Sequence, residues 1–203
     1  SNRNTWSNDS YGGARGNSAP ATYDIVKIGY SGSPGAYVRH RVTLDVGTAA
    51  SPTEIAALVL EQNPEAGADE NEMSRLIIPP TTGLRINGTV SGDGEIQFQM
   101  DGTDIPTLEG DLGDFVNTEG ASFIMRSNNG NVTAPTNLTR FPRLSIPGAS
   151  SSYIATRSVT FETDIYCHNL NVRYGGTLLL NDGADGDIEI RDSLRIGGIG
   201  SDN

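Results

Sequence analysis

The stretch "CHNLNVRYGGTLLLNDGADGDIEIRDSLRIGG", from Cys167 to Gly198, decides the fold, because runs of alternating apolar and polar residues are separated in it by glycine turns. Alternation with a period of two is typical of β-strands, whose successive side chains point to opposite faces. The same pattern begins at Gly83, where short apolar runs such as "IQF", "FIM" and "VTF" are separated by Gly, Asn, Asp and Pro. These patterns predict a mainly all-β protein made of many short strands.

Two of these stretches resemble one another. "GLRINGTVSGDGEIQF", from Gly83 to Phe98, and "GTLLLNDGADGDIEI", from Gly176 to Ile190, both run from an apolar triplet through Gly and Asp to a second triplet. A loose repeat of this kind favours stacked units of variable length, so we predict a β-solenoid or β-helix-like stack of short strands.

The chain divides into three predicted regions. Residues 1–47 are expected to form an N-terminal cap with the first strands, in which Trp6, the only tryptophan, covers one end of the core. Residues 48–82 are expected to form a helix-containing insertion. Residues 83–203 are expected to form the solenoid-like region, with a loop excursion at 110–152. No capping signal follows Ile196, so we expect the chain to continue past Asn203 or a partner to cover this end.

The first region contains a clear strand signal. "YVRHRVTLDV", from Tyr37 to Val46, alternates strictly and predicts a half-buried strand. His40 lies on the otherwise apolar face, where a packed or edge histidine is favoured over a metal ligand. The other residues of that face are Val38, Val42, Leu44 and Val46.

The insertion contains the only segment with helix signals, "SPTEIAALVLEQN". Ser51 is a good N-cap, Pro52 suits the first helical turn, and Glu54 completes a capping box. We therefore predict one short helix here, with one apolar face formed by Ile55, Leu58 and Val59.

Composition narrows the set of partners. The 203 residues include 14 Lys and Arg against 25 Asp and Glu, a formal net charge of −11. This charge disfavours nucleic acid and anionic lipid as partners. No apolar run approaches the length of a membrane helix, so membrane insertion is not expected. Cys167 is the only cysteine, which excludes an intrachain disulfide and favours a packed thiol over a nucleophile.

The sequence contains no recognisable catalytic motif, and we assign no catalytic residue. "GASSSY" is not a nucleophile elbow and both histidines lie within strand-like sequence, so nucleophilic catalysis is not favoured. A carboxylate pair for glycoside hydrolysis is a minority alternative, because four acidic residues lie in glycine-rich turns. These residues are Asp101, Asp104, Asp111 and Asp114.

"NDGADGD", from Asn181 to Asp187, is the candidate calcium site. Its oxygen-bearing side chains surround two glycines on one turn, and Ca²⁺ prefers such ligands. Asp-Gly pairs also form ordinary turns, and we favour the turn over the ion. The candidate ligands are Asn181, Asp182, Asp185 and Asp187, and no other cofactor is predicted.

The opening "TWSNDSYGGARGNSAPATYDIVKIG" resembles the lead-in of secreted bacterial surface proteins with β-helical repeats. In that lead-in a Trp-Ser motif, a glycine-rich stretch and a Pro-x-x-x-Asp-x-Val-x-Ile segment precede the first repeat. Residues Asn169 to Gly183 resemble the Leu-x-Val strand, glycine turn and Thr-Leu-x-Leu strand with which such proteins continue. The matching residues of the opening are Trp6, Ser7, Pro20, Asp24, Val26 and Ile28.

This resemblance implies an extracellular adhesin or surface-filament component, used for attachment or gliding, and it transfers no catalytic residue. We therefore expect a non-enzymatic structural or adhesive protein, secreted or on the cell surface, that binds a protein or glycan partner through loops. One alternative is a viral tail or capsid fibre or decoration domain that forms a homo-oligomer on a virion. Another is a polysaccharide-degrading β-helix enzyme.

Overall fold

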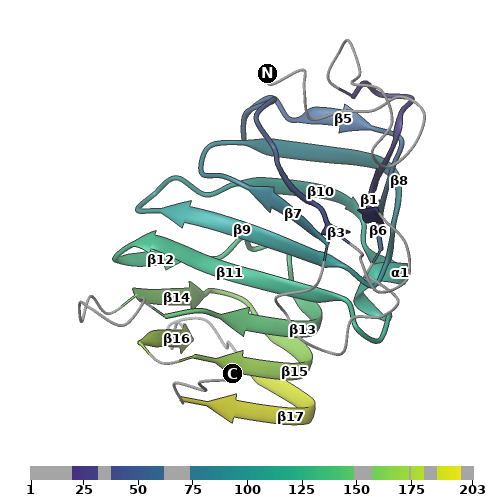
Figure 1. The fold of residues 1–203 in the computed structure, drawn as a ribbon. Coiled ribbons are helices and arrows are strands. Elements are labelled where there is room, and N and C mark those ends of the chain that lie inside the picture. Colours follow the sequence, from purple (N-terminus) through teal and green to yellow (C-terminus); the bar gives the residue numbers. More distant parts are fainter. Residues whose placement is uncertain are drawn as a thin grey trace.

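The structure is a computed structural model that describes residues 20–31, 38–61, 74–148, 157–173, 175–180 and 187–197. Trp6 lies outside these residues. Figure 1 shows the strands stacked in layers, with β5 near one end and the yellow β17 at the other. The prediction of a mainly β protein is confirmed, since the chain contains seventeen strands and a single short helix within the described ranges.

The largest sheet has seven strands, all parallel, and their spatial order follows the chain. Each inner strand pairs with the previous and the next strand of the same sheet, and the residues between two such strands contribute strands to other sheets. In spatial order the strands are β4 (Arg41–Thr43), β7 (Arg75–Ile78), β9 (Glu95–Asp101), β11 (Ser122–Asn129), β13 (Arg140–Ile146), β15 (Ile165–Val172) and β17 (Ile188–Ile196).

The strands that lie between these strands in the sequence form two further parallel sheets. The second sheet consists of β1 (Ile25–Ile28), β6 (Ala57–Leu60), β8 (Gly83–Gly92) and β10 (Thr107–Asp111), and β5 (Thr53–Ile55) also pairs with β8. The third sheet consists of β12 (Asn131–Thr133), β14 (Arg157–Phe161) and β16 (Gly176–Leu180). A small antiparallel pair is formed by β2 (Tyr30–Ser31) and β3 (Val38–Arg39). This set of parallel sheets is consistent with a β-helix.

In-register pairing stacks equivalent side chains into columns. One inward column of the seven-stranded sheet runs through Leu144, Leu170 and Leu194, which lie opposite one another on β13, β15 and β17. Leu144 is fully buried, whereas Leu194, on the last described strand, is 53% exposed. Because parallel strands bury side chains between sheets, these columns form the core.

Phenylalanine rings fill the middle of the core. Phe123 stands edge-on to Phe115, with ring centroids 5.4 Å apart, and to Phe141 at 5.3 Å. Phe141 in turn stands edge-on to Phe161 at 6.0 Å. Edge-to-face contacts of this kind add to the hydrophobic gain of burying each ring. The helix α1 (Gly113–Val116) contributes Phe115 to this cluster and packs against β8 and β13.

The helix predicted from Ser51 is wrong, because these residues form β5 and β6. Buried residues follow the strand period, so Leu58 and Leu60 point inward while Val59 between them is only half-buried. Backbone pairing of β6 with β1 and β8 on its two sides outweighs the local capping signals. Glu54 forms an ion pair with Arg85 at 3.0 Å instead of capping a helix.

The loop excursion predicted at 110–152 is also wrong for most of its length. Apart from α1, this segment contains β11, β12 and β13, which continue the parallel sheets. Asn and Pro favour turns locally, but here each strand is paired with its neighbours in the stack, and this pairing satisfies the backbone groups.

The strand predicted from Tyr37 to Val46 is confirmed in part, because Arg41–Thr43 form β4 of the seven-stranded sheet, whereas Val38–Arg39 form β3 of the antiparallel pair, and Tyr37 lies outside the described residues. Val42 and Leu44 are buried, while Arg41, Thr43 and Asp45 are exposed. The packed thiol is confirmed as well, since Cys167 is fully buried, and burial raises its pKa to about 12.

Close packing between neighbouring layers requires one glycine in particular. Gly92 has a φ of +97°, and a Cβ at this position would lie 1.9 Å from the carbonyl oxygen of Leu60 on the adjacent β6. A side chain here would meet both backbone strain and a backbone clash, so only glycine allows β8 to pass β6 at this distance.

A polar cleft as the candidate functional site

A polar cleft of about 420 Å³ is lined by side chains of the seven-stranded sheet and by the segment before β11. One wall is the segment that joins α1 to β11, including Asn117 and Glu119. The other wall comes from the outward side chains of β13, β15 and β17. The residues that project into it from these strands are Arg143, His168, Asn169, Arg191 and Asp192.

The pairing register explains why these side chains meet. Arg143, Asn169 and Ser193 occupy equivalent positions on three consecutive strands and form one outward column. Asn169 is fixed within this column, because its Oδ1 accepts a hydrogen bond from Ser193 Oγ at 2.6 Å. Strands that lie about 4.8 Å apart thus present polar groups at regular intervals along the cleft.

A β-bulge in the pairing of β15 with β17 affects which side chains meet in the cleft. Cys167 pairs with Ile190 and Asn169 pairs with Ser193, so His168 alone faces two residues, Arg191 and Asp192. An extra residue of this kind bends the strand and redirects its side chains. The bulge thereby brings Asp192 beside His168 at the edge of the cleft.

His168 and Asp192 form a hydrogen-bonded pair, with 3.2 Å between Nδ1 and Oδ2. An ionised carboxylate only accepts hydrogen bonds, so Nδ1 donates and the ring orientation is set from this side. Asp192 also lies 3.9 Å from the Arg191 guanidinium, measured between Oδ1 and Nε. The Nε2 atom of His168 is then the ring nitrogen left for a ligand.

An aromatic side chain supports this pair. The Tyr166 ring stands edge-on to His168, with centroids 5.5 Å apart. The guanidinium carbon of Arg140 lies 5.6 Å from the Tyr166 centroid, within the range of a cation–π contact. Tyr166 therefore limits the rotation of both neighbours.

A buried polar cluster lies farther along the same face. Arg75 donates to Glu95 Oε2 at 2.8 Å and to Gln97 Oε1 at 2.9 Å. Burial raises the pKa of Glu95, an effect that the nearby guanidinium groups of Arg75, Arg41 and Arg143 oppose. Among the described residues, the second carboxylate oxygen of Glu95 has no hydrogen-bond partner, although the side chain is fully buried.

The carboxylates proposed from the sequence for glycoside hydrolysis do not line the cleft. Asp101 and Asp104 join through backbone hydrogen bonds in the turn after β9. Asp111 is the last residue of β10 and accepts a hydrogen bond from the Gly113 backbone at 2.9 Å, close in the sequence to Asp114 in the first turn of α1. In the sequence, most of β10 lies between Asp104 and Asp111.

Of the candidate calcium ligands, Asn181, Asp182 and Asp185 lie outside the described residues. Asp187 is exposed, and its backbone N–H donates to Asp164 Oδ1 at 2.9 Å. Over the ranges that the structure describes, no three His, Cys, Asp or Glu side chains are grouped to hold a metal ion.

Sequence reasoning did not find the cleft. His168 and Asp192 are 24 residues apart, so no short motif contains both. The separation of 24 residues matches the length of chain between paired positions on β15 and β17. This match can be recognised only once the strand register is known.

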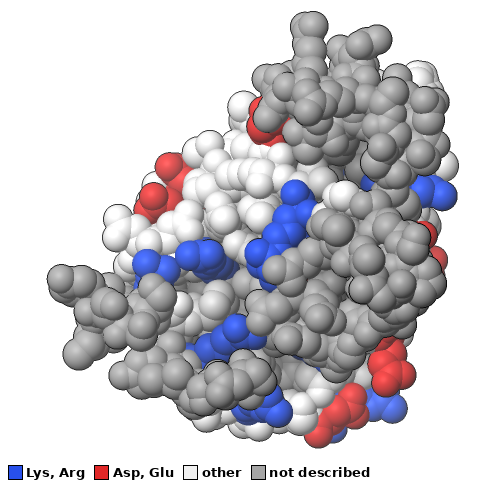
Figure 2. All heavy atoms as spheres, in the orientation of Figure 1, with Lys and Arg blue, Asp and Glu red and all other residues white. Residues whose placement is uncertain are grey.

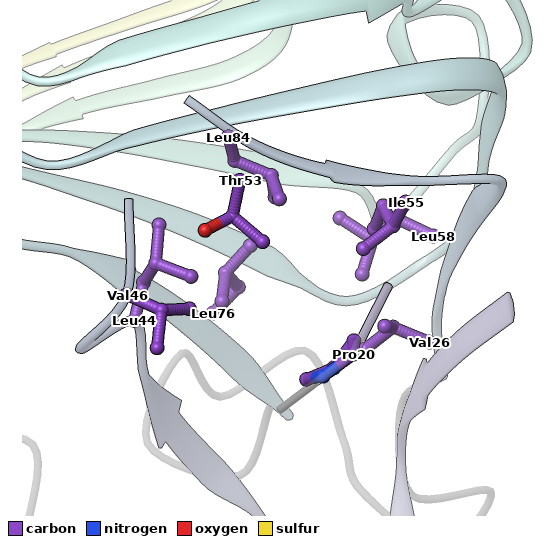
Figure 3. A pocket seen from close by; sticks show the side chains of 9 residues that line it. All are labelled: Pro20, Val26, Leu44, Val46, Thr53, Ile55, Leu58, Leu76 and Leu84. Atoms are coloured by element: carbon purple, nitrogen blue, oxygen red, sulfur yellow. The ribbon is translucent and has the colours of Figure 1, made fainter. Parts of the chain in front are cut away.

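A second hollow is apolar and belongs to the core. Figure 3 shows Leu44, Leu76 and Leu84 around it, with Thr53 as the one polar side chain among those that line it. Its volume is about 10 Å³, which is room for about one water molecule. We interpret it as a packing gap near the N-terminal end of the core.

In the described part of the chain, no helix has both the length and the hydrophobicity needed to cross a membrane. Comparison with known proteins finds no protein-family model, no curated protein and no solved structure that matches this chain.

Proposed function

We propose that this chain is a β-solenoid module of a non-enzymatic adhesive protein, secreted or on a cell surface, and that it binds a saccharide on its partner surface. The observation that carries the proposal is the polar cleft, in which strands of one rigid sheet hold Arg143, His168 and Asn169 side by side. The resemblance of the opening segment to secreted surface proteins supports the location.

Parallel pairing in chain order supports the solenoid. Each strand of the seven-stranded sheet is followed along the chain by strands of another sheet before the chain returns one layer farther along. Parallel sheets whose layers contact mainly their neighbours are the arrangement expected of a solenoid.

The chemistry of the cleft supports a saccharide. Amide, guanidinium, imidazole and carboxylate groups together offer both donors and acceptors, which match the hydroxyl groups of a sugar. Their positions are set by strands and by side-chain hydrogen bonds, so little conformational entropy is lost when a ligand binds.

A glycan panel tests the proposal. We expect the full chain to retain at least one saccharide without consuming it, and Asn169→Ala to weaken that binding about tenfold, since it removes a polar contact. Asn87→Ala is the matched control, because Asn87 is exposed on β8, outside the cleft. Failure of the wild-type chain to retain any glycan would contradict the proposal.

One observation favours a second candidate, a polysaccharide-cleaving activity. A carboxylate that orients an imidazole from its Nδ1 side leaves Nε2 to act as a general base. If the chain were such an enzyme, polysaccharide incubated with it would shorten, and His168→Gln and Asp192→Asn would each abolish the cleavage. An unchanged polysaccharide chain length after prolonged incubation supports adhesion without turnover.

A further inference from the structure

The charges of this protein are unevenly placed. Although the whole chain carries 14 basic and 25 acidic side chains, the strands of the seven-stranded sheet carry seven arginines and only four acidic residues. Figure 2 shows Lys and Arg side chains spread over the face that this sheet presents in Figure 1, with Asp and Glu toward its margins. The arginines are Arg41, Arg75, Arg126, Arg140, Arg143, Arg191 and Arg195; the acids are Glu95, Asp101, Glu189 and Asp192.

Arg143 forms no direct ion pair in the cleft, although its guanidinium lies near the Glu95 carboxylate. Arg143 is half-buried, and no acidic side chain in the described ranges forms an ion pair with it. Glu95, the buried acid on this face, is already paired with Arg75. A partly desolvated guanidinium without a direct ion pair is unfavourable, so this position suits a ligand that supplies an anion.

We propose that the ligand of the cleft is an acidic polysaccharide, whose carboxylates bind Arg143 and Arg191. This inference rests on the proposed saccharide-binding function and names the class of saccharide. The planar guanidinium donates two parallel hydrogen bonds to a carboxylate, while Asn169 and His168 lie between the two arginines to meet hydroxyl groups.

The spacing of the strands fits a polymer. Arg143 lies on β13 and Arg191 on β17, and these two strands are two intervals apart in the sheet, about 10 Å. Arg191 is also offset by two residues along β17 from Ser193, which is in register with Arg143. A sugar chain that crosses the strands can therefore place two of its carboxylates on the two arginines at once. Simultaneous contacts along one chain raise the overall affinity beyond that of either contact.

Nucleic acid is the less favoured polyanion. Its phosphates are densely spaced, so a duplex would bring its high charge against a protein with a net charge of −11. The sheet face also alternates its arginines with amide and hydroxyl side chains such as Asn169 and Ser193, which suits a sparsely charged, hydroxyl-rich chain.

The experiment measures retention of the full chain on immobilised polygalacturonate, with dextran as the neutral polysaccharide and a DNA duplex as the other polyanion. We expect binding to polygalacturonate alone, weakened by added salt. Arg143→Gln and Arg191→Gln should each lower the affinity about tenfold, and Arg143→Lys should retain part of it. Arg157→Gln is the control, since it removes the same charge from the third sheet and should have no effect.

The outcomes separate this inference from the proposed function. Equal binding of dextran, or polygalacturonate binding that both Gln variants leave unchanged, overturns the acidic ligand while saccharide binding stands. Failure to bind any saccharide of the wider panel overturns both. Preferential binding of the DNA duplex, lost in Arg143→Gln, also overturns the inference. Circular dichroism of each variant shows that the loss is not a loss of folding.

Discussion

Replacing leucines of one inward column tests the stacked arrangement most directly. Leu144 and Leu194 belong to the same column, two strands apart, and differ mainly in exposure, 0% against 53%. We expect Leu144→Ala to be much more destabilising than Leu194→Ala, although the chemical change is the same.

The magnitude follows from burial. Truncating a fully buried leucine costs the transfer free energy of the lost carbons and leaves a cavity, together about 3 kcal/mol. Leu194 loses only about half of that transfer free energy and opens no enclosed cavity, so its truncation should cost about 1 kcal/mol. The two variants should therefore differ by about 2 kcal/mol in the free energy of unfolding.

Urea denaturation followed by far-ultraviolet circular dichroism measures this difference. The midpoint should shift strongly for Leu144→Ala and weakly for Leu194→Ala, with equal m-values. Equal losses in the two variants would refute the reasoning, because they would mean that Leu194 is as buried as Leu144 in the native protein. An unaffected Leu144→Ala would refute the inward placement of the whole column.

Three further predictions concern backbone packing, pH and thiol reactivity. Gly92→Ala should lower the free energy of unfolding by several kcal/mol, because the new Cβ would meet the Leu60 carbonyl oxygen. Gly130→Ala is the control: Gly130 also has a positive φ, +65°, but open space around it, so this change should cost only about 1 kcal/mol. Similar losses for the two variants in thermal or urea unfolding would disprove the close approach of β8 to β6. Burial raises the pKa of Glu95 in the folded protein above its ordinary 4.5, so the folded state binds the carboxyl proton of Glu95 more tightly than the unfolded state does. The stability that this protonation contributes should therefore be lost as the pH rises from 4.5 through the folded-state pKa. Glu95→Gln should flatten that part of the stability–pH curve, and an unchanged slope would contradict the assignment. The Cys167 thiol, buried and with its pKa raised to about 12, should react with iodoacetamide only after urea unfolding, and rapid labelling of the native protein in a mass spectrum would show otherwise.

The sequence predicted strands correctly where apolar and polar residues alternate in step with buried and exposed side chains. Alternation around Val42 and from Leu170 to Val172 reflects which side chains point into the core, and those strands form there. The segment from Thr53 to Leu60 shows the limit of such reasoning. Its capping residues favour a helix locally, but two flanking parallel strands supply more hydrogen bonds and contacts than an isolated helix could.

The cleft could not be predicted in this way, because it depends on register. His168 meets Asp192 only because one bulge lets a single residue of β15 face two residues of β17. A shift of one residue would turn the outward side chains inward, and no sequence pattern specifies where a bulge lies. The overall composition also gives no indication that arginines gather on the seven-stranded sheet, since these residues are dispersed along the sequence of an acidic chain.

The serial pairing of the large sheet has a mechanical consequence. Tension applied near residue 197 would detach β17 from β15 before it loads β13, because each strand is held by its immediate neighbours. Ile165 and Ile188 are partners 23 residues apart, so each detachment would release about 80 Å of extended chain. Under load, such a protein would lengthen in steps and dissipate energy at each one, while the layers farther from the pull keep their structure and their ligand.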